Sequence, residues 1–146
     1  MKIVIVTHKD SNIFNKKNEL MSALSEHSVS IIFRTSQENI LSKLNSESPD
    51  LLISIDLEGF DMSTLTGGYA YNLLKIQQLH LLLNKSLFNS SILSSPLSLR
   101  MTFICPKESD ANMLKKKFPD LPSVYSLENL PASYPFMIAS KLFKVI

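Results

Sequence analysis

Three short, almost uninterrupted apolar runs constrain the fold of this sequence more than any other feature. They cover residues 2–6, 50–57 and 100–105, and they are rich in Ile, Val, Leu and Phe. A strand with one face in water alternates apolar and polar residues, whereas a strand covered on both faces is apolar along its length. Strands covered on both faces are typical of parallel sheets, so the runs predict an α/β protein with a mostly parallel sheet.

The segments between these runs predict two further strands and several helices. Residues 29–33 are expected to form the second strand and residues 79–83 the fourth, although a helix over residues 71–83 is an alternative. Thr35 and Glu38 have the spacing of a capping box, which predicts a helix that buries Ile40, Leu41 and Leu44. Further helices are expected near residues 13–24, 109–118 and 133–146.

Strands that alternate with helices imply right-handed crossovers and helices on both faces of the sheet. We therefore predict a three-layer, flavodoxin-like or Rossmann-like sandwich with five strands in the order 2-1-3-4-5. The length of 146 residues fits one domain, and no internal repeat is visible. The expected organisation is a single α/β domain over residues 1–146.

Composition excludes several classes of protein. The net charge is +2, and the densest basic group, Lys115–Lys117, fits the end of a helix. No aromatic residues interleave with these lysines, so no nucleic-acid partner is expected. The single cysteine, Cys105, cannot form an internal disulfide and lies inside an apolar run, which indicates a buried strand residue in a reducing compartment.

Targeting signals are not expected either. The residues after Met1 lack a small-residue cleavage site, and every apolar segment is too short to cross a bilayer. The sequence therefore predicts a cytoplasmic protein without membrane contact.

Polar residues that follow the predicted strands are the first candidates for a site. In an open parallel sheet, ligands bind outside the carboxyl ends of the strands, where the strand order reverses. His8 could donate to an anionic ligand or act as an acid or base, or it could be a loop histidine without a special partner. The candidates at this rim are Thr7, His8, Asp10, Asp56, Glu58, Gly59, Asn84, Lys85 and Lys107.

All three glycines lie between Gly59 and Gly68, which makes this stretch distinctive in a glycine-poor chain. Adjacent glycines permit close approach of a ligand to the backbone, and tyrosines offer aromatic faces and hydroxyls. A site for a sugar, a nucleobase or a peptide could be built here; a plain turn with the tyrosines packed sideways is the alternative. The residues concerned are Gly67, Gly68, Tyr69, Tyr71 and Asn72.

No catalytic, metal or cofactor motif is found. The three histidines have no metal-ligand spacing, and His80 lies in an apolar run that favours a core histidine. The loop after the first strand contains no glycine and matches no nucleotide-binding fingerprint. We therefore expect no metal and no cofactor, and a non-catalytic domain that binds a small polar ligand or a protein partner.

Two resemblances to known families add expectations. Residues 49–56, followed by Gly59 and Asp61, resemble the segment of response-regulator receiver domains that carries the phosphoacceptor, with Asp56 at the acceptor position. The chain has residues 7–9, Thr-His-Lys, where receivers have an acidic pair, and Pro106-Lys107 reverses the family's Lys-Pro. This resemblance implies a receiver-like signalling module without a functional phosphorylation site.

The second resemblance covers more of the chain. The Pro-Asp-Leu-Leu-Ile segment at 49–53, Met-Thr-Phe-Ile-Cys-Pro at 101–106 and Leu-Lys-Lys-Lys-Phe-Pro at 114–119 resemble the N-terminal half of two-domain, GT-B-type glycosyltransferases. That family binds its nucleotide-sugar donor mainly through the other half. The resemblance therefore implies a glycan-related domain that binds an acceptor or a partner and does not itself transfer sugar.

Residues 85–98 form a serine-rich connector that also carries Leu87, Phe88, Ile92 and Leu93. Apolar residues this dense in a loop either fold back on the core or meet another chain. We predict a homodimer contact at this segment or at the adjoining fourth helix.

Overall fold

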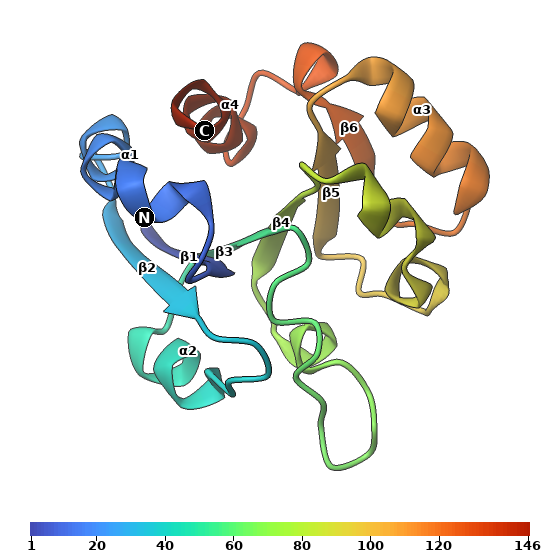
Figure 1. Cartoon of the computed structure of the whole chain (residues 1–146), viewed down its shortest axis with the longest axis horizontal. Helices are drawn as coiled ribbons and strands as arrows, with labels where there is room; N and C mark the ends of the chain where they lie inside the picture. Colours follow the sequence, from blue (N-terminus) through green and yellow to red (C-terminus); the bar gives the residue numbers. More distant parts are fainter.

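The computed structural model describes all residues from Met1 to Ile146 and contains one six-stranded parallel sheet (Figure 1). The order across the sheet is β2-β1-β3-β4-β5-β6. The strands are β1 (Lys2–His8), β2 (Ser28–Arg34), β3 (Leu51–Ile55), β4 (Gln77–Leu81), β5 (Met101–Cys105) and β6 (Val124–Ser126). The predicted α/β class, parallel pairing and order of the first five strands are confirmed.

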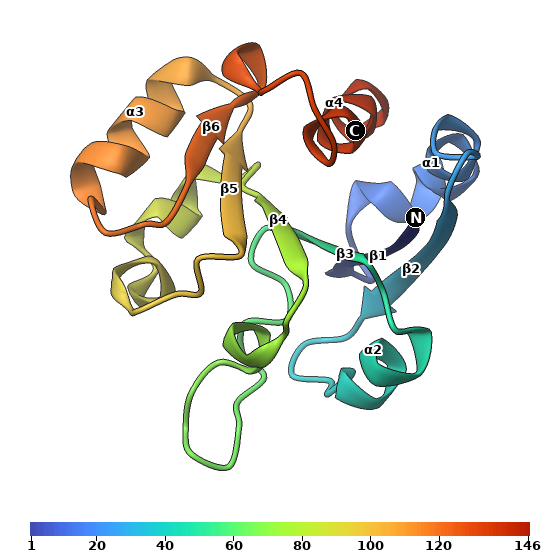
Figure 2. The ribbon, with the colours of Figure 1, turned by 180° about the vertical axis from the view of Figure 1, so that it is seen from behind.

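Helices cover both faces of the sheet, as the three-layer prediction requires (Figures 1 and 2). On one face, α1 (Lys17–Ala23) and α4 (Phe136–Val145) pack over a core of 14 buried residues. On the other, α2 (Leu41–Glu47) and α3 (Glu108–Lys117) enclose a core of 20 buried residues. Every residue of β3 and β5 is buried, which explains why both strands are apolar apart from Ser54 and Thr102.

The sheet differs from the prediction at its far edge, where β6 adds a sixth strand. β6 pairs in parallel with β5 through Phe103 and Val124, Ile104 and Tyr125, and Cys105 and Ser126. A strand of three residues is too short to produce a recognisable alternation of apolar and polar side chains. The chain then passes through a 3-10 helix at Leu127–Asn129 before α4.

The ambiguous segment 71–83 is divided between two elements. Ala70–Leu73 forms a 3-10 helix, and β4 begins at Gln77, two residues before the predicted start. Gln78 is fully buried, and its Nε2 donates to the carbonyl oxygen of Tyr71 at 2.8 Å. His80 is the predicted core histidine: its Nδ1 lies 2.5 Å from Ser54 Oγ, and its Nε2 lies 3.0 Å from Gln78 Oε1.

The capping-box prediction is only partly correct. Thr35 donates its backbone N–H and its hydroxyl to Glu38 Oε2, both at 3.1 Å. However, α2 begins at Leu41, and the residues between Glu38 and Leu41 form no helix. The Thr35–Glu38 contact therefore stabilises a turn ahead of the helix.

The serine-rich connector folds into two 3-10 helices, Lys85–Asn89 and Ser91–Ser94. Phe88 and Leu93 are buried in the core beneath α3, and Leu87 and Ile92 pack against the same core. These side chains therefore fold back on their own domain, which was the first of the two alternatives for this segment. No helix is of a length and hydropathy that would carry it through a bilayer.

Candidate functional site

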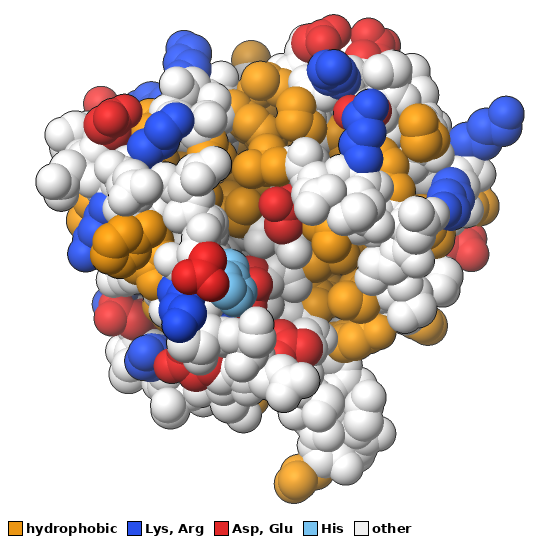
Figure 3. Space-filling view, in the orientation of Figure 1, with side chains coloured by type: hydrophobic (Ala, Val, Ile, Leu, Met, Phe, Trp, Pro, Cys, Tyr) orange, Lys and Arg blue, Asp and Glu red, His pale blue; other side chains and the backbone are white.

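The carboxyl ends of β1, β3 and β4 meet at a cleft of about 550 Å³, which we call the switch-point cleft. The strand order reverses between β1 and β3, so the cleft lies where ligands bind in open parallel sheets. Figure 3 shows a hollow on this face with apolar side chains beside carboxylates. Its lining comprises Asp10, Ser11, Asn12, Ile13, Lys16, Ile55, Asp56, Leu83, Asn84, Lys85 and Ile146.

Asp56 is held at the centre of this edge by a tight turn. The N–H of Glu58 donates to the carbonyl oxygen of Ile55 at 3.1 Å, and the two residues between them, Asp56 and Leu57, have φ values of 53° and 60°. Both are in the left-handed region, which Asp tolerates better than Leu. Asp56 Oδ1 accepts hydrogen bonds from the backbone N–H groups of Leu83 at 2.7 Å and Asn84 at 3.1 Å. The carboxylate therefore joins the ends of β3 and β4.

The loop after β1 supplies the second wall of the cleft. Thr7 is buried, and its hydroxyl donates to Ser11 Oγ at 3.0 Å, which positions Ser11 in the lining. Asp10 and Asn12 line the cleft beside Ser11.

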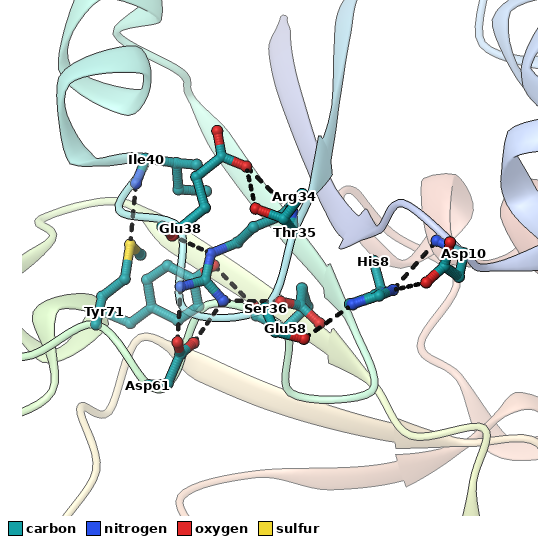
Figure 4. Close-up of polar contacts among 11 residues, drawn as sticks. His8, Asp10, Arg34, Thr35, Ser36, Glu38, Ile40, Glu58, Asp61 and Tyr71 are labelled. Carbon is teal, nitrogen blue, oxygen red and sulfur yellow. Dashed lines mark hydrogen bonds and ion pairs between the residues drawn. The ribbon is translucent and has the colours of Figure 1, made fainter.

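His8 does not line the cleft. Its Nε2 lies 3.2 Å from Ser36 Oγ, and its Nδ1 accepts the backbone N–H of Asp10 at 3.1 Å (Figure 4). The ring thus bridges the loop after β1, at Asp10, and the loop after β2, at Ser36, which favours a positioning role over contact with a ligand in the cleft.

Two lysines border the cleft, and both have partners within the chain. Lys16 Nζ donates to the carbonyl oxygen of Val145 at 3.0 Å, which ties the loop after β1 to the end of α4. Lys85 Nζ lies 3.3 Å from Asp110 Oδ1, and Asp110 is buried in the first turn of α3. Lys107 is exposed immediately before α3 and does not line the cleft.

A buried ion cluster lies beside this edge, centred on Arg34 at the end of β2 (Figure 4). Arg34 Nη1 contacts Asp61 Oδ1 at 2.5 Å and Glu58 Oε1 at 2.7 Å, and Nη2 contacts Asp61 Oδ2 at 2.7 Å. Nε donates to the carbonyl oxygen of Glu38. The guanidinium therefore makes four hydrogen bonds and ties the loop after β2 to the turn after β3.

The charges of this cluster support one another. The hydrogen bonds from Arg34 lower the pKa of Asp61, against the effect of partial burial. Burial disfavours the cation, yet the hydrogen bonds to Asp61 and Glu58 raise the pKa of Arg34. Both groups stay charged at neutral pH, so the cluster is a structural ion pair.

Gly59 and Tyr71 belong to the packing around this cluster. Tyr71 is fully buried, and its hydroxyl donates to the carbonyl oxygen of Glu58 at 2.8 Å. Burial raises the pKa of this phenol. The ring of Tyr71 packs edge-on against Phe60, and Tyr69 contacts the same ring. The two tyrosines are packed sideways, which was the alternative to a binding site in this stretch.

Gly67 and Gly68 lie in the exposed loop between Ser63 and Tyr69, which projects at the bottom of Figure 1. Gly67 has a φ of 87°, and its N–H donates to the carbonyl oxygen of Thr64 at 3.0 Å. Asn72 accepts the N–H of Ser98 at 2.8 Å and donates to the carbonyl oxygen of Pro96 at 3.2 Å. The structure does not bring these residues to the switch-point cleft.

Asp10, Asp56, Asn84 and Lys85 were predicted from the sequence as rim residues, and all four line the cleft. Arg34, at the centre of the neighbouring ion cluster, was not predicted. The available signal was that Arg34 is one of two arginines and directly ends an apolar strand. Its partners are separated from it by 24 and 27 residues, so no local spacing connects them.

The fold and the cleft define an α/β domain of the flavodoxin-like or Rossmann-like class with a hollow at its topological switch point. No protein-family model matches the chain, and no curated protein matches its sequence. No group of three or more His, Cys, Asp or Glu side chains is arranged to hold a metal ion.

Proposed function

We propose that this chain is a non-catalytic domain that binds a small, neutral, hydroxyl-rich molecule, such as a sugar, in the switch-point cleft. The observation that carries the proposal is the convergence of polar side chains from the ends of β1, β3 and β4 on one cleft. This role agrees with the acceptor-binding or partner-binding role that the glycosyltransferase resemblance implies.

The balance of charges supports a neutral ligand. Asp10, Asp56, Lys16 and Lys85 all line the cleft, so the lining carries two acidic and two basic side chains. Both lysines already contact acceptors of the chain itself. A site for a phosphate needs unpaired cations or a cradle of backbone N–H groups. The two lysines of this lining are paired, and their charges are balanced by the two carboxylates.

The mixture of polar and apolar groups supports a sugar. Carboxylate, amide and hydroxyl groups of Asp56, Asn12 and Ser11 can exchange hydrogen bonds with hydroxyls. Ile13, Ile55, Leu83 and Ile146 supply apolar surface for the C–H groups of a ring. The volume falls within the range of small-molecule sites, roughly 300–1,000 Å³.

The lining also favours binding over catalysis. It contains no histidine and no cysteine, and the Ser11 hydroxyl accepts the hydrogen bond of Thr7. Burial raises the pKa of the Cys105 thiol to about 12, so this cysteine is inert inside β5.

Titration of the ¹⁵N-labelled chain with neutral hexoses and pentoses tests the proposal. We expect amide shift changes at Asp10, Asp56 and Asn84. Asn12→Ala removes an exposed amide of the lining and should weaken binding by about three- to tenfold. Asn18→Ala, at an exposed position of α1 outside the cleft, is the matched control. Shift changes confined to the loop between Ser63 and Tyr69, or seen only with inorganic phosphate, would contradict the proposal.

A receiver-like signalling module is the second candidate. The observation in its favour is that Asp56 lies at the end of β3, where the receiver resemblance puts the acceptor. Against it, Asp56 Oδ1 accepts two backbone hydrogen bonds, and Glu58 and Asp61 are paired with Arg34. A phosphoryl transfer needs a cation to neutralise the developing charge.

Incubation with a small phosphodonor and magnesium separates the two candidates. We expect no acid-labile phosphate on the chain, with an Asp56→Asn variant as the blank. Phosphate that appears on the wild type and is absent from Asp56→Asn would favour the signalling module.

A further inference from the structure

The outer edge of β2 is the most exposed pairing surface of the molecule. β2 spans seven residues at one end of the sheet, and no strand pairs with its outer edge. At the opposite end, β6 has only three residues. The two edges therefore differ strongly in their capacity to pair with another strand.

Hydrogen bonds to β1 show which backbone groups of β2 point outward. The N–H of Ser28 donates to the carbonyl oxygen of Met1, and the N–H of Lys9 donates to that of Arg34. In a parallel ladder every second residue bonds to the same neighbour, so Ser28, Ser30, Ile32 and Arg34 face β1. The N–H and C=O groups of the other three residues, Val29, Ile31 and Phe33, point away from the sheet.

An apolar stripe accompanies these outward groups. Val29, Ile31 and Phe33 are only partly buried. Phe14 is 59% exposed and packs edge-on against Phe33 at 5.1 Å, and Met21 of α1 is 37% exposed. A groove of about 570 Å³ runs along the strand between α1 and α2. The edge thus offers both hydrogen-bonding groups and apolar surface.

The strand β2 itself lacks the usual features that prevent pairing, although Lys17 and Lys43 line the groove beside it. Proteins protect long edge strands with proline, exposed lysine, a bulge or a short strand. β2 contains no proline and no lysine, its register against β1 is continuous over seven residues, and its one charged residue, Arg34, is buried. Such an edge is suited to an interface.

We propose that β2 pairs antiparallel with β2 of a second copy of this chain, about a two-fold axis through Ile31. The three outward residues are symmetric about Ile31, so Ile31 would face its own copy and Val29 would face the partner's Phe33. Each such pair exchanges two backbone hydrogen bonds. The result is one continuous sheet of both copies.

The charges on α2 fit this arrangement. Lys43 and Glu47 both line the groove, and Glu47 Oε2 lies 3.2 Å from Ser30 Oγ, which puts it level with Ser30. α2 runs antiparallel to β2, and four residues of helix advance about as far as two residues of strand. Lys43 is therefore level with Ile32. Rotation about Ile31 places Glu47 of one copy opposite Lys43 of the other at two symmetric positions. These contacts would add to the pairs that Glu47 and Lys43 make with Lys2 at 3.1 Å and Glu38 at 3.6 Å of their own chain.

Light scattering across a concentration series tests the dimer. We expect wild-type dimers at micromolar concentration. Ile31→Pro removes an outward N–H that has no partner within the chain, and it should weaken dimerisation at least tenfold. Ile31→Val keeps the N–H and is the matched control. Circular dichroism verifies that the variants are folded.

Charge exchange on α2 tests the register, with circular dichroism on each variant because Lys43 and Glu47 also pair with Glu38 and Lys2 of their own chain. Lys43→Glu and Glu47→Lys each place like charges opposite one another and should each weaken the homodimer about tenfold. An equimolar mixture of the two variants restores both pairs in a heterodimer and should recover wild-type affinity. A wild type that stays monomeric at several hundred micromolar, a dimer unaffected by Ile31→Pro, or a mixture that does not recover would each overturn the proposal.

Discussion

Tyr71 occupies the space that a side chain at Gly59 would need: a Cβ built on Gly59 would lie 1.9 Å from Tyr71 Oη. Gly59 also has a φ of 96°, which L residues rarely adopt. The hydroxyl of Tyr71 in turn reaches the carbonyl oxygen of Glu58, so the glycine lets the aromatic ring close the turn that follows β3. Glycine is required here by packing and by backbone conformation together.

The three glycines should therefore differ in their sensitivity to alanine. Gly59→Ala combines a left-handed conformation with a steric clash and should cost about 2–4 kcal/mol of unfolding free energy. Gly67→Ala has open space but a φ of 87°, so we expect about 1 kcal/mol. Gly68→Ala has neither constraint and should change stability by less than about 0.5 kcal/mol. Urea unfolding measures the series, and a different ranking would contradict this account of the turn.

Replacement of Arg34 should lower the free energy of unfolding, relative to wild type, by more at pH 6 than at pH 3. Arg34→Met leaves Glu58 and Asp61 without their cation and should cost about 2–3 kcal/mol at pH 6, less than for a fully buried pair because Asp61 is 42% exposed. Arg34 lowers the pKa of Asp61 in the folded chain. The stabilisation from this ion pair is therefore complete above the pKa of Asp61 in the unfolded chain, near 4, and is lost as the pH falls through its pKa in the folded chain. The difference in unfolding free energy between wild type and Arg34→Met should thus be smaller at pH 3 than at pH 6.

Arg100→Met is the control for this experiment, since Arg100 is the other arginine and is exposed. It should leave urea unfolding unchanged at both pH values. A difference for Arg34→Met that stays constant between pH 6 and pH 3 would argue against the ion pair as its cause.

His80 should make the fold sensitive to mild acid. Burial lowers the pKa of His80 to about 3, while the unfolded chain takes up the proton near pH 6.5. The stability that depends on a neutral His80 is fully present above about pH 6.5. Below about pH 6 the free energy of unfolding should fall by about 1.4 kcal/mol per pH unit. NMR should show the His80 ring neutral at pH 5. A His8→Ala variant should retain the same acid slope, and a protonated His80 ring at pH 5 would refute the prediction.

Phe88→Asp should act on folding and not on association. Phe88 is buried in the core beneath α3, so a carboxylate there is desolvated without a partner. We expect a loss of about 3–5 kcal/mol in unfolding free energy, measured by thermal and urea denaturation. Ser86→Asp, at an exposed position of the same 3-10 helix, is the comparison and should cost far less. A well-folded Phe88→Asp chain would contradict the burial.

The elements that could be predicted from sequence are those whose signal is local. β1, β3 and β5 are buried on both faces over most of their length and are therefore mainly apolar, and α3 ends in three lysines that suit its dipole. The parallel order followed from strands alternating with helices. The start of β4 was missed because Gln77 and Gln78 are polar, and Gln78 is buried only because Tyr71 and His80 bond to it.

The candidate site was predicted only where topology decides it. The ends of parallel strands share one edge, so Asp56 and Asn84 meet whatever the details of the loops. The use of glycine could not be assigned in this way, because the partner of Gly59 is the Tyr71 ring, twelve positions along the chain. Arg34, likewise, depends on tertiary contacts that have no period in the sequence.

The shortness of β6 limits how far copies of this chain can assemble. A sheet with two open edges can add copies at both ends and grow into a fibre. Here only the seven residues of β2 offer a long edge, while β6 ends the sheet after three residues. Pairing through β2 uses the same surface on both copies, so it closes on itself after one step and leaves a finite particle.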